Sequence, residues 1–586
     1  MLGGWAKPCS VYVIICHTNA RSALLAATRP CLESPIAFMR EAREERVLLS
    51  LTLPRVLAAR QAGGARRASA KFKRGLGTYG RHSFSFSHPS KGLFRPNIFT
   101  RLRQCDKYHT ILLMENGDAF IDLISKKRVQ LVIKGGDPCI EVGGGLQVSL
   151  YDVIGSAVIE TQQSEGTKLL VYAYPRSVGR QYPCGKVYPI AKRRPQYLHF
   201  MTPKAQLAKR WDQRIKELAW RESWLSRQDG LDGTHKSKRW RQRRLLVVLN
   251  PAAGRGQSQA VYTSVVAPML EQAGVAHELV VTRKAQEAKS LMHNLNTEAW
   301  DCVVAIGGDG LLSEIVQGLY SQDPVSCHPL TRLPLAIVPS GTGNGMAASF
   351  LYQQAEVPCP INAMFLILKA KSTVPADLSL VEASDGQRMS FLALSFGLVA
   401  DVDLESEVIR WAGSFRMDLF ALYAILRLRS YRARLSYLPS KEGPPPRAAA
   451  LPPLRARLPD ASGWVHMEHD FLMVLISHVS HIAESAHSNP GKRMGDGTLQ
   501  ILVLRRQPSL SRLRLISLFL ALERGYHVTA DEVEIYNAVA YRLESLTERG
   551  VYTLDGEAVP CGSIQGRILP QAMRILGSAV LERQEK

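Results

Sequence analysis

Apolar strands that alternate with helices, several of them followed by glycine-rich turns, constrain the fold of this chain more than any other feature. Over residues 245–374 the strands read LLVVLN, HELVVT, CVVAIGG and PLAIVPSG, and helix-like segments such as AQEAKSLMHNL and LLSEIVQGLY separate them. Continuous apolar strands are typical of a sheet buried on both faces. Strands that alternate with helices predict a parallel, doubly wound α/β sheet. In such sheets ligands bind beyond the carboxyl ends of the strands, where these turns fall.

Residues 109–222 predict a smaller β module that precedes this sheet. Segments such as DAFIDLIS, RVQLVIK and KLLVYAYP partly alternate and are separated by Gly, Asp and other polar residues, which is typical of an antiparallel sheet. They end in the segment PKAQLAKRWDQRIKELAW, where Leu207, Trp211, Ile215 and Leu218 share one helical face. Strands closed by one C-terminal helix favour a pleckstrin-homology-like barrel. Modules of that class bind lipid headgroups or proteins, or only pack internally.

Residues 375–575 read mainly as strands again. ADLSLVEA, ARLSYLP, DFLMVLIS and TLQILVLRR favour a β-sandwich, which a proline-rich surface loop at 439–463 interrupts. Residues 576–586 form a tail. The predicted fold class is therefore α/β plus β, with a doubly wound parallel sheet, then a sandwich, and the β module in front.

The charge of the chain favours polyanionic partners. Of its 586 residues 74 are Lys or Arg and 51 are Asp or Glu, which gives a formal net charge of +23. Nucleic acid, anionic membrane surfaces and phosphorylated small molecules all fit such a balance. The basic residues crowd into residues 1–108 and into the segment 223–244, which contains KSKRWRQRR. We interpret the first as a disordered extension, although its composition also suits a transit peptide, and the second as a solvated linker.

Cysteines and apolar runs give indications about the compartment. The ten cysteines form no CxxC pairs and have no neighbouring histidines, so neither a zinc site nor a disulfide framework is indicated. A reducing, intracellular setting fits that usage. No apolar run reaches the ~18 residues of a membrane-spanning helix. We predict a cytoplasmic protein with peripheral membrane association, and the Lys/Arg clusters leave nuclear entry open.

Two glycine-rich loops at the predicted sheet edge point to phosphate binding. The first is NPAAGRG, residues 250–256, and the other is PSGTGNGMA, residues 339–347. Glycine lets the backbone approach a phosphate closely, and the helix that follows offers unpaired N–H groups and a favourable dipole. Neither loop matches a Walker A or a dinucleotide fingerprint. Together at one edge, they predict a site for nucleotide phosphates.

An aspartate lies between these loops, in the turn GGDG. A carboxylate is repelled by phosphates, so Asp309 is better suited to accept the proton of an incoming hydroxyl during phosphoryl transfer. Gly307, Gly308 and Gly310 leave room for both substrates. Glu314, one helical turn further on, either orients Asp309, helps to hold Mg²⁺, or is a carboxylate stabilised by a helix dipole.

The motifs NPAAGRG, GGDGLLSEIVQGL, PSGTGNGMA, FGLVADVDLESE and LDGEAV resemble, in this order, those of the sphingosine kinases within the diacylglycerol-kinase-like lipid kinases. The resemblance covers about residues 245–575. It is specific, because the wider family shares the glycine-rich loops but generally not DVDLESE. LYDVIGSAV and VYAYP are similar to the N-terminal extension of the longer sphingosine kinases.

The resemblance implies that ATP and Mg²⁺ bind between the α/β domain and the sandwich, and that sphingosine enters a pocket of the sandwich. Asp309 resembles the catalytic base, and Asp403 the residue that recognises the amino-alcohol head. The implied ATP contacts are Asn250, Pro251, Ala252, Thr282, Arg283, Lys284, Ala285, Gln286, Gly341, Thr342, Gly343, Arg410, Arg416, Asp555, Gly556 and Glu557. The implied substrate contacts are Gly307, Gly308, Asp309, Gly310 and Asp403.

Four alternatives remain beside an ATP:sphingosine phosphotransferase. A ceramide or diacylglycerol kinase would share the loops, but a neutral lipid gives Asp403 no cation to meet. An NAD kinase also uses a GGDG loop, without this acidic run. A catalytically inactive lipid-binding scaffold would rely on the β module instead. For the phosphotransferase we expect peripheral contact with anionic membranes and no need for nucleic acid, and the sequence leaves the oligomeric state open.

Overall fold

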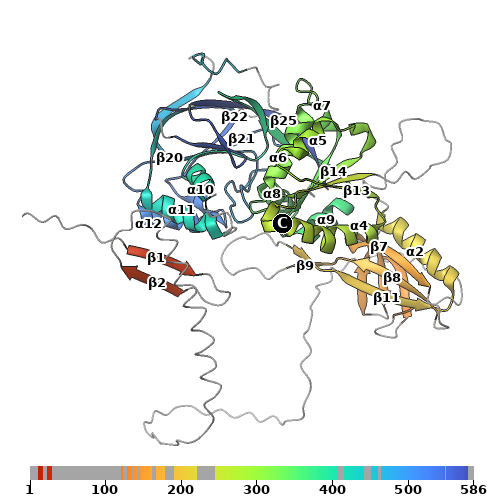
Figure 1. Cartoon of the computed structure of the whole chain (residues 1–586). Coiled ribbons are helices and arrows are strands. Elements are labelled where there is room, and N and C mark those ends of the chain that lie inside the picture. The colour runs from red at the N-terminus through yellow and green to blue at the C-terminus, as the bar shows by residue number, and fades with distance from the viewer. Residues whose placement is uncertain are drawn as a thin grey trace, which may run out of the picture. The chain divides into compact units, whose positions relative to one another are not determined.

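The computed structural model places β strands and helices in two compact units, residues 1–101 and 102–586. In the first unit β1 (Val11–Cys16) pairs antiparallel with β2 (Ala23–Thr28). The other elements belong to the second unit (Figure 1). The structure describes residues 11–16, 23–28, 120–122, 128–134, 137–142, 145–160, 166–178, 191–220, 223, 244–406, 408, 415–440, 451–458, 463–547 and 550–577. Most of the predicted extension 1–108 and of the basic linker 223–244 therefore lies outside the described residues.

The β module contains a seven-stranded antiparallel sheet of order β6-β5-β4-β3-β11-β8-β7. Its strands are β3 (Phe120–Asp122), β4 (Arg128–Lys134), β5 (Asp137–Val142), β6 (Leu146–Ser149), β7 (Val153–Glu160), β8 (Thr167–Ala173) and β11 (Gln196–Thr202). Helix α2 (Ala205–Trp220) buries Leu207 and Ile215 against this sheet, on the apolar face that the sequence indicates. A two-stranded arm, β9 (Arg176–Val178) with β10 (Ala191–Arg193), extends from the module.

The α/β part has the predicted parallel sheet, of order β13-β12-β14-β15. The strands are β12 (Leu245–Leu249), β13 (His277–Val281), β14 (Cys302–Gly307) and β15 (Leu335–Pro339). Alternate residues of these strands enter two different cores. Helices α5 (Glu287–His293) and α6 (Asp309–Tyr320) cover one face, and α4 (Ala267–Ala273) and α9 (Pro360–Leu368) cover the other (Figure 1). Burial of both faces explains why β12, β14 and β15 are continuously apolar, whereas the edge strand β13 is only partly buried.

The sandwich region continues this sheet instead of forming a separate one. Its strands are β16 (Ser372–Ala383), β17 (Gly386–Ser390), β18 (Ala393–Gly397), β19 (Tyr431–Pro439), β20 (Val465–Ser477), β21 (Leu499–Arg505), β22 (Glu534–Ser545), β23 (Tyr552–Leu554), β24 (Glu557–Val559) and β25 (Ser563–Gly577). The long strand β25 pairs with β16 and β22, and Ile575 near its end lies in parallel register with Leu335 of β15. One 14-stranded sheet therefore joins the two regions.

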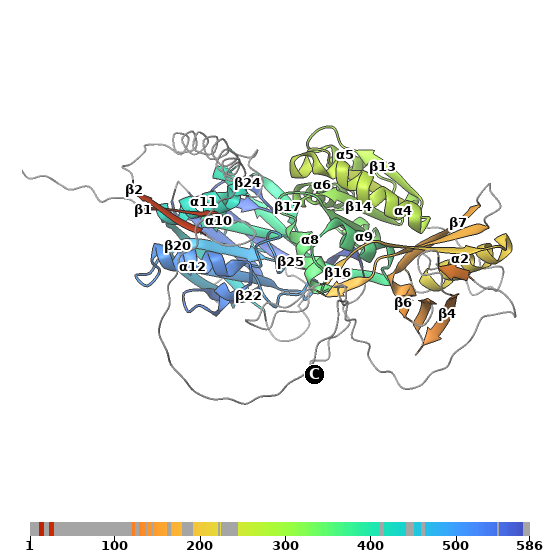
Figure 2. The same cartoon turned by 90° about the horizontal axis from the view of Figure 1, so that it is seen from below.

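Three helices, α10 (Leu398–Glu405), α11 (Phe415–Arg427) and α12 (Arg512–Leu522), lie together beside the sandwich strands (Figures 1 and 2). Part of the predicted proline-rich loop is fixed by hydrogen bonds, because the Arg542 guanidinium donates to the carbonyls of Pro452 (3.2 Å) and Pro453 (3.1 Å). Among the described residues, none of the helices combines the length and the apolarity that a membrane crossing requires.

Candidate active site

Three loops meet at the carboxyl edge of the parallel sheet. They follow β12, β14 and β15, and backbone hydrogen bonds connect them to one another. The N–H of Asn250 donates to the carbonyl of Ile306 (3.2 Å), and that of Ser340 donates to the carbonyl of Gly307 (3.1 Å). The structure thus brings together the two glycine-rich loops and the GGDG turn, as the sequence predicts.

Glycines in these loops allow the loops to pack against each other. A Cβ atom on Gly341 would lie only 2.4 Å from the Cα of Gly308, and one on Gly254 would lie 1.9 Å from the carbonyl oxygen of Ser340. Gly254 also has a positive φ of 56°. Asn344 fixes the last loop, since its Oδ1 accepts from the N–H of Gly341 (2.9 Å) and its Nδ2 donates to the same residue's carbonyl (3.0 Å). Loop packing therefore requires some of the glycines that we assigned to phosphate approach.

Asp309 is the first residue of α6, and its carboxylate is bound at the N-terminus of a second helix. Oδ2 accepts from the N–H of Gly345 (2.8 Å) and Oδ1 from the N–H of Met346 (3.1 Å), both in the first turn of α8 (Gly345–Gln353). Burial raises the pKa of the Asp309 carboxyl, and the surrounding backbone N–H groups act in the opposite direction. The side chain is half-buried. Its two hydrogen bonds fix the carboxylate between the GGDG turn and the last glycine-rich loop.

Glu314 does not take the orienting role that we considered for it. Its Oε2 accepts from the backbone N–H of Ala288 at 3.1 Å, in the first turn of α5. The helix dipole that acts on Glu314 is therefore that of the neighbouring helix α5 and not that of its own helix, since the N-terminal N–H groups of a helix favour a carboxylate. Within the described part of the chain, no group of three or more His, Cys, Asp or Glu side chains is arranged to hold a metal ion.

The segment 282–286 follows β13 and lies beside the first loop. Thr282 is buried, and its N–H donates to the carbonyl of Leu249 at 2.9 Å. The backbone N–H groups of Arg283 and Lys284 donate to Oε2 of Glu287, at 2.5 and 3.2 Å. Both basic side chains are exposed at the same edge of the sheet. They are free to extend towards a polyanion there, and Gln286 adopts a positive φ of 64° at the start of α5.

Helix α10 carries Asp401 and Asp403, the first two acids of DVDLESE, beside the sandwich strands. Asp403 is half-buried, and its Oδ2 accepts from Oγ1 of Thr553 at 3.1 Å. Asp401 is the more buried acid, and the hydroxyl of Tyr431 lies 2.8 and 2.7 Å from its two carboxylate oxygens. Residues two apart on a helix face different directions. The sequence showed both acids but gave no signal for which one points into the core, and we had not singled out Asp401.

Asp555 holds a backbone segment of the sandwich. Its buried carboxylate accepts from Oγ of Ser390 (2.8 Å) and from the N–H groups of residues 391–393 (3.1, 3.0 and 3.0 Å). Burial raises its pKa to about 6. A Cβ atom on Gly345 would lie 2.8 Å from Cδ1 of Leu392, so this segment reaches the helix that binds Asp309. Gly556 and Glu557 are exposed in the following turn. Arg410 and the side chain of Arg416 lie outside the described residues.

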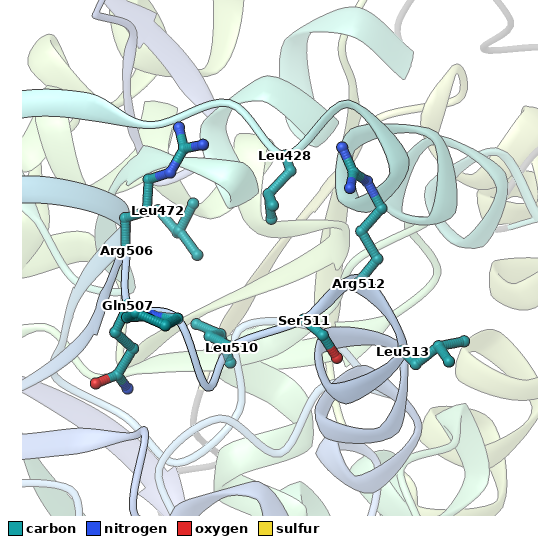
Figure 3. Close-up of a pocket in the computed structure, with 9 residues that line it drawn as sticks. Leu428, Leu472, Arg506, Gln507, Leu510, Ser511, Arg512 and Leu513 are labelled. Atoms are coloured by element: carbon teal, nitrogen blue, oxygen red, sulfur yellow. The ribbon is translucent and has the colours of Figure 1, made fainter. Parts of the chain in front are cut away.

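A groove of about 580 Å³ lies between the end of α11, β20 and the start of α12 (Figure 3). Leu428, Leu472 and Leu510 line it, with Arg506 and Arg512 on two sides. Both guanidinium groups have protein partners, because Arg506 donates to Oγ of Ser430 (3.1 Å) and Arg512 to the carbonyl of Leu426 (2.8 Å). None of the predicted site residues lines this groove, so the glycine-rich loops remain the candidate active site.

Comparisons with known proteins identify the families that the α/β part and the sandwich region resemble. The family model described as the diacylglycerol kinase catalytic domain matches residues 244–381, and the YegS C-terminal NAD kinase beta sandwich-like domain matches residues 393–577. Both begin after the β module, so they give no support to its pleckstrin-homology-like class.

Three curated relatives are similar to more than half of this chain. Sphingosine kinase 1 of Rattus norvegicus is 34% identical over 348 residues, which cover 56% of this chain and 89% of that protein. Sphingosine kinase 1 of Homo sapiens is 32% identical over 355 residues, covering 58% and 91%. Sphingosine kinase 1 of Arabidopsis thaliana is 29% identical over 343 residues, covering 55% and 70%.

Proposed function

Because this chain belongs to the sphingosine kinase family of lipid kinases, we propose that it transfers the γ-phosphate of ATP to the primary hydroxyl of sphingosine or sphinganine. The observation that carries this proposal is the position of the Asp309 carboxylate. Asp309 follows β14, which lies between the strands that precede the two glycine-rich loops, and two N–H groups of α8 fix its carboxylate. That is where a proton acceptor is needed if the loops hold the phosphates of ATP.

In the proposed reaction, one set of residues at this edge binds ATP and another residue accepts the proton. The glycine-rich loops and the exposed Arg283 and Lys284 bind the phosphates, while Asp309 takes the proton of the lipid hydroxyl. The hydroxyl oxygen then forms a bond to the γ-phosphorus, the bond to the bridging oxygen breaks, and ADP leaves. Mg²⁺ bound to ATP supplies charge neutralisation at the phosphates. The products are a sphingoid-base phosphate, ADP and the proton held by Asp309.

Asp403 is the residue that we propose to select a cationic substrate. It is half-buried on α10, and one hydrogen bond to its carboxylate comes from the hydroxyl of Thr553. A carboxylate in a partly dry position favours an ammonium partner, because the attraction is stronger there than in water. Ceramide and diacylglycerol lack that ammonium group. This argument favours sphingoid bases over both neutral lipids.

The experiment is ATP-dependent phosphorylation of sphingosine, sphinganine, ceramide and diacylglycerol in detergent micelles. We expect the free bases to be the substrates. Asp403→Asn should lower kcat/KM for them about 10- to 100-fold, as the loss of a charge-assisted hydrogen bond of roughly 1.5–3 kcal/mol implies. Asp385→Asn, at an exposed turn between β16 and β17, is the matched control and should change little.

Other outcomes of this panel would choose among the alternatives. Preferred phosphorylation of ceramide or diacylglycerol would overturn the role of Asp403 while leaving the phosphotransferase chemistry in place. Binding of sphingosine without any loss of the γ-phosphate of ATP would favour the inactive scaffold.

We further propose peripheral contact with anionic membranes from the cytoplasmic side. The substrate is a membrane lipid, and the net charge of +23 is concentrated in segments such as KSKRWRQRR. A Lys or Arg near an anionic surface contributes about 1 kcal/mol. Replacing Lys236, Lys238 and Arg239 with Ser should therefore weaken co-sedimentation with phosphatidylserine vesicles by about 100-fold or more. Leu513→Ser, on the exposed face of α12, tests an apolar contact with the membrane. If only this variant weakens vesicle binding, the contact is made by Leu513 and not by the basic segment.

A further inference from the structure

Helix α8 is bound at both of its ends. Its N-terminal N–H groups donate to Asp309, and its C-terminal end meets the arm of the β module. Arg176 of the arm donates through Nη2 to the carbonyls of Gln354 (3.2 Å) and Ala355 (3.0 Å). An anion at the N-terminus and a cation at the C-terminus both complement the dipole of the helix. The nine-residue helix thus connects the module to the proposed base.

The contact of the arm with the end of α8 is centred on a buried carboxylate that both arginines of the arm bind. Glu356 is 1% exposed and binds Nε of Arg176 and Nη2 of Arg193, both at 3.1 Å. Arg193 also binds Asp152 of its own module at 2.8 Å, and its guanidinium lies 3.6 Å from the ring centroid of Phe365 on α9. Removal of one partner from a buried ion pair leaves an uncompensated charge. This network therefore fixes the geometry of the arm against the helix.

Backbone pairing continues the same contact. The N–H of Ala191 donates to the carbonyl of Ala355 (3.0 Å), and the N–H of Val357 donates back to the carbonyl of Ala191 (2.9 Å). Asn362 of α9 accepts from the N–H of Arg193 at 3.0 Å and donates to Oε2 of Glu356 at 3.1 Å. The backbone after α8 therefore pairs with the arm as a short parallel β-bridge.

The body of the module is packed on the α/β part as well. Ile154 and Tyr174 belong to the same apolar core as strand β12. The hydroxyl of Tyr174 donates to Oε1 of Gln272 on α4 at 2.8 Å, and a Cβ atom on Gly155 would lie 1.9 Å from the carbonyl oxygen of Gln272. Strand β7 accordingly lies beside α4 (Figures 1 and 2). This packing holds the body of the module on the α/β part, so the arm starts from a fixed position beside α8.

We infer that Arg176 and Arg193 are positioning residues, which hold α8 so that its N-terminus fixes the Asp309 carboxylate. The inference rests on the proposed role of Asp309 and assigns the β module a part in catalysis, besides any binding function of its own. When the C-terminal end of α8 loosens, the N–H groups of Gly345 and Met346 move away from the carboxylate. The carboxylate then loses donors that favour its charged form, so its pKa rises.

The test compares Arg176→Met and Arg193→Met with Lys192→Met in the full chain. Lys192 lies on the same arm with an exposed side chain, so it controls for loss of charge. We expect both arginine variants to lower kcat about 2- to 30-fold with little change in the KM for ATP. The acid limb of the kcat–pH profile should move to higher pH, because Asp309 acts as a base only when ionised. Amide exchange in peptides covering residues 340–350 should be about 10-fold faster.

Arg176 is half-exposed, so Arg176→Met keeps the test valid if Arg193→Met fails to fold. Unchanged exchange and an unchanged acid limb in Arg176→Met would overturn the inference. Faster exchange with an unmoved acid limb would also overturn it, since α8 would then move without affecting the base. Full activity of Asp309→Asn would contradict the proposed function instead, because Asp309 would then not be the base. Faster amide exchange in Arg176→Met would still support the connection between the arm and α8.

Discussion

Asp309→Asn should lower kcat for sphingosine by about 10²- to 10⁴-fold, the range typical for removal of a general base. The asparagine keeps an oxygen that can accept one N–H group of α8, but its amide nitrogen faces the other. The substitution therefore removes the proton acceptor with a small change in shape. In the proposed reaction ATP is bound mainly by the loops, so the KM for ATP should change little.

Glu314→Gln is the matched control for this experiment. Both acids lie in the first two turns of α6, and both accept backbone N–H groups from the start of another helix. Only Asp309 lies at the loop edge, so Glu314→Gln should retain kcat close to that of the original chain. Its amide oxygen can still accept from Ala288, so the melting temperature should fall by only a few degrees. A large loss of kcat in both variants would instead point to the position of α6 as the cause.

An Asp309→Asn variant that keeps its activity would contradict the general-base role. The carboxylate would then serve only to bind the N-terminus of α8, which its two hydrogen bonds would also explain. Steady-state kinetics with sphingosine, with thermal unfolding as a check on folding, separate these two interpretations.

The parts of the fold that depend on local patterns could be predicted from the sequence. Strands β12, β14 and β15 are continuously apolar because both faces are buried, and the glycine-rich turns mark their carboxyl ends. The positions of Asp309 and the two loops at one edge follow from parallel pairing alone. The helix at the end of the β module was equally visible in its apolar face.

Contacts between distant segments could not be predicted in this way. The pairing of Leu335 with Ile575 joins two strands 240 residues apart, and nothing local to either strand specifies the partner. The contact of Glu314 with Ala288 depends on how α6 packs beside α5. The arm of the β module is similar, because Arg193 looks like a solvated base in RRPQY until Glu356 is placed beside it. Roles that depend on tertiary neighbours therefore had to come from the structure.

Asp555 is the site residue for which the structure suggests the largest effect on stability. We expect Asp555→Ala to lower the free energy of unfolding by about 4 kcal/mol or more. The substitution leaves one buried hydroxyl and three buried N–H groups without their acceptor, and each unsatisfied buried group costs about 1–3 kcal/mol. Domains commonly have only about 5–15 kcal/mol of stability, so much of the chain should unfold in mild denaturant.

Asp555→Asn should be the milder change. Asp555 has a positive φ of 52°, a conformation that asparagine adopts more readily than alanine. Its amide oxygen can still accept from some of the four donors. Urea unfolding of the two variants, followed by tryptophan fluorescence, should therefore show the alanine variant with the lower midpoint.

Glu557→Ala separates this structural role from the nucleotide contact that the family resemblance implies for the same turn. Glu557 is exposed, so its replacement should leave the unfolding midpoint unchanged. If the turn touches ATP, the KM for ATP should rise in that variant although the fold is intact. A rise in KM in Asp555→Ala without loss of stability would contradict our interpretation of the buried carboxylate. The segment 390–393 would then have to be held by other contacts, and Leu392 would remain against Gly345 without Asp555.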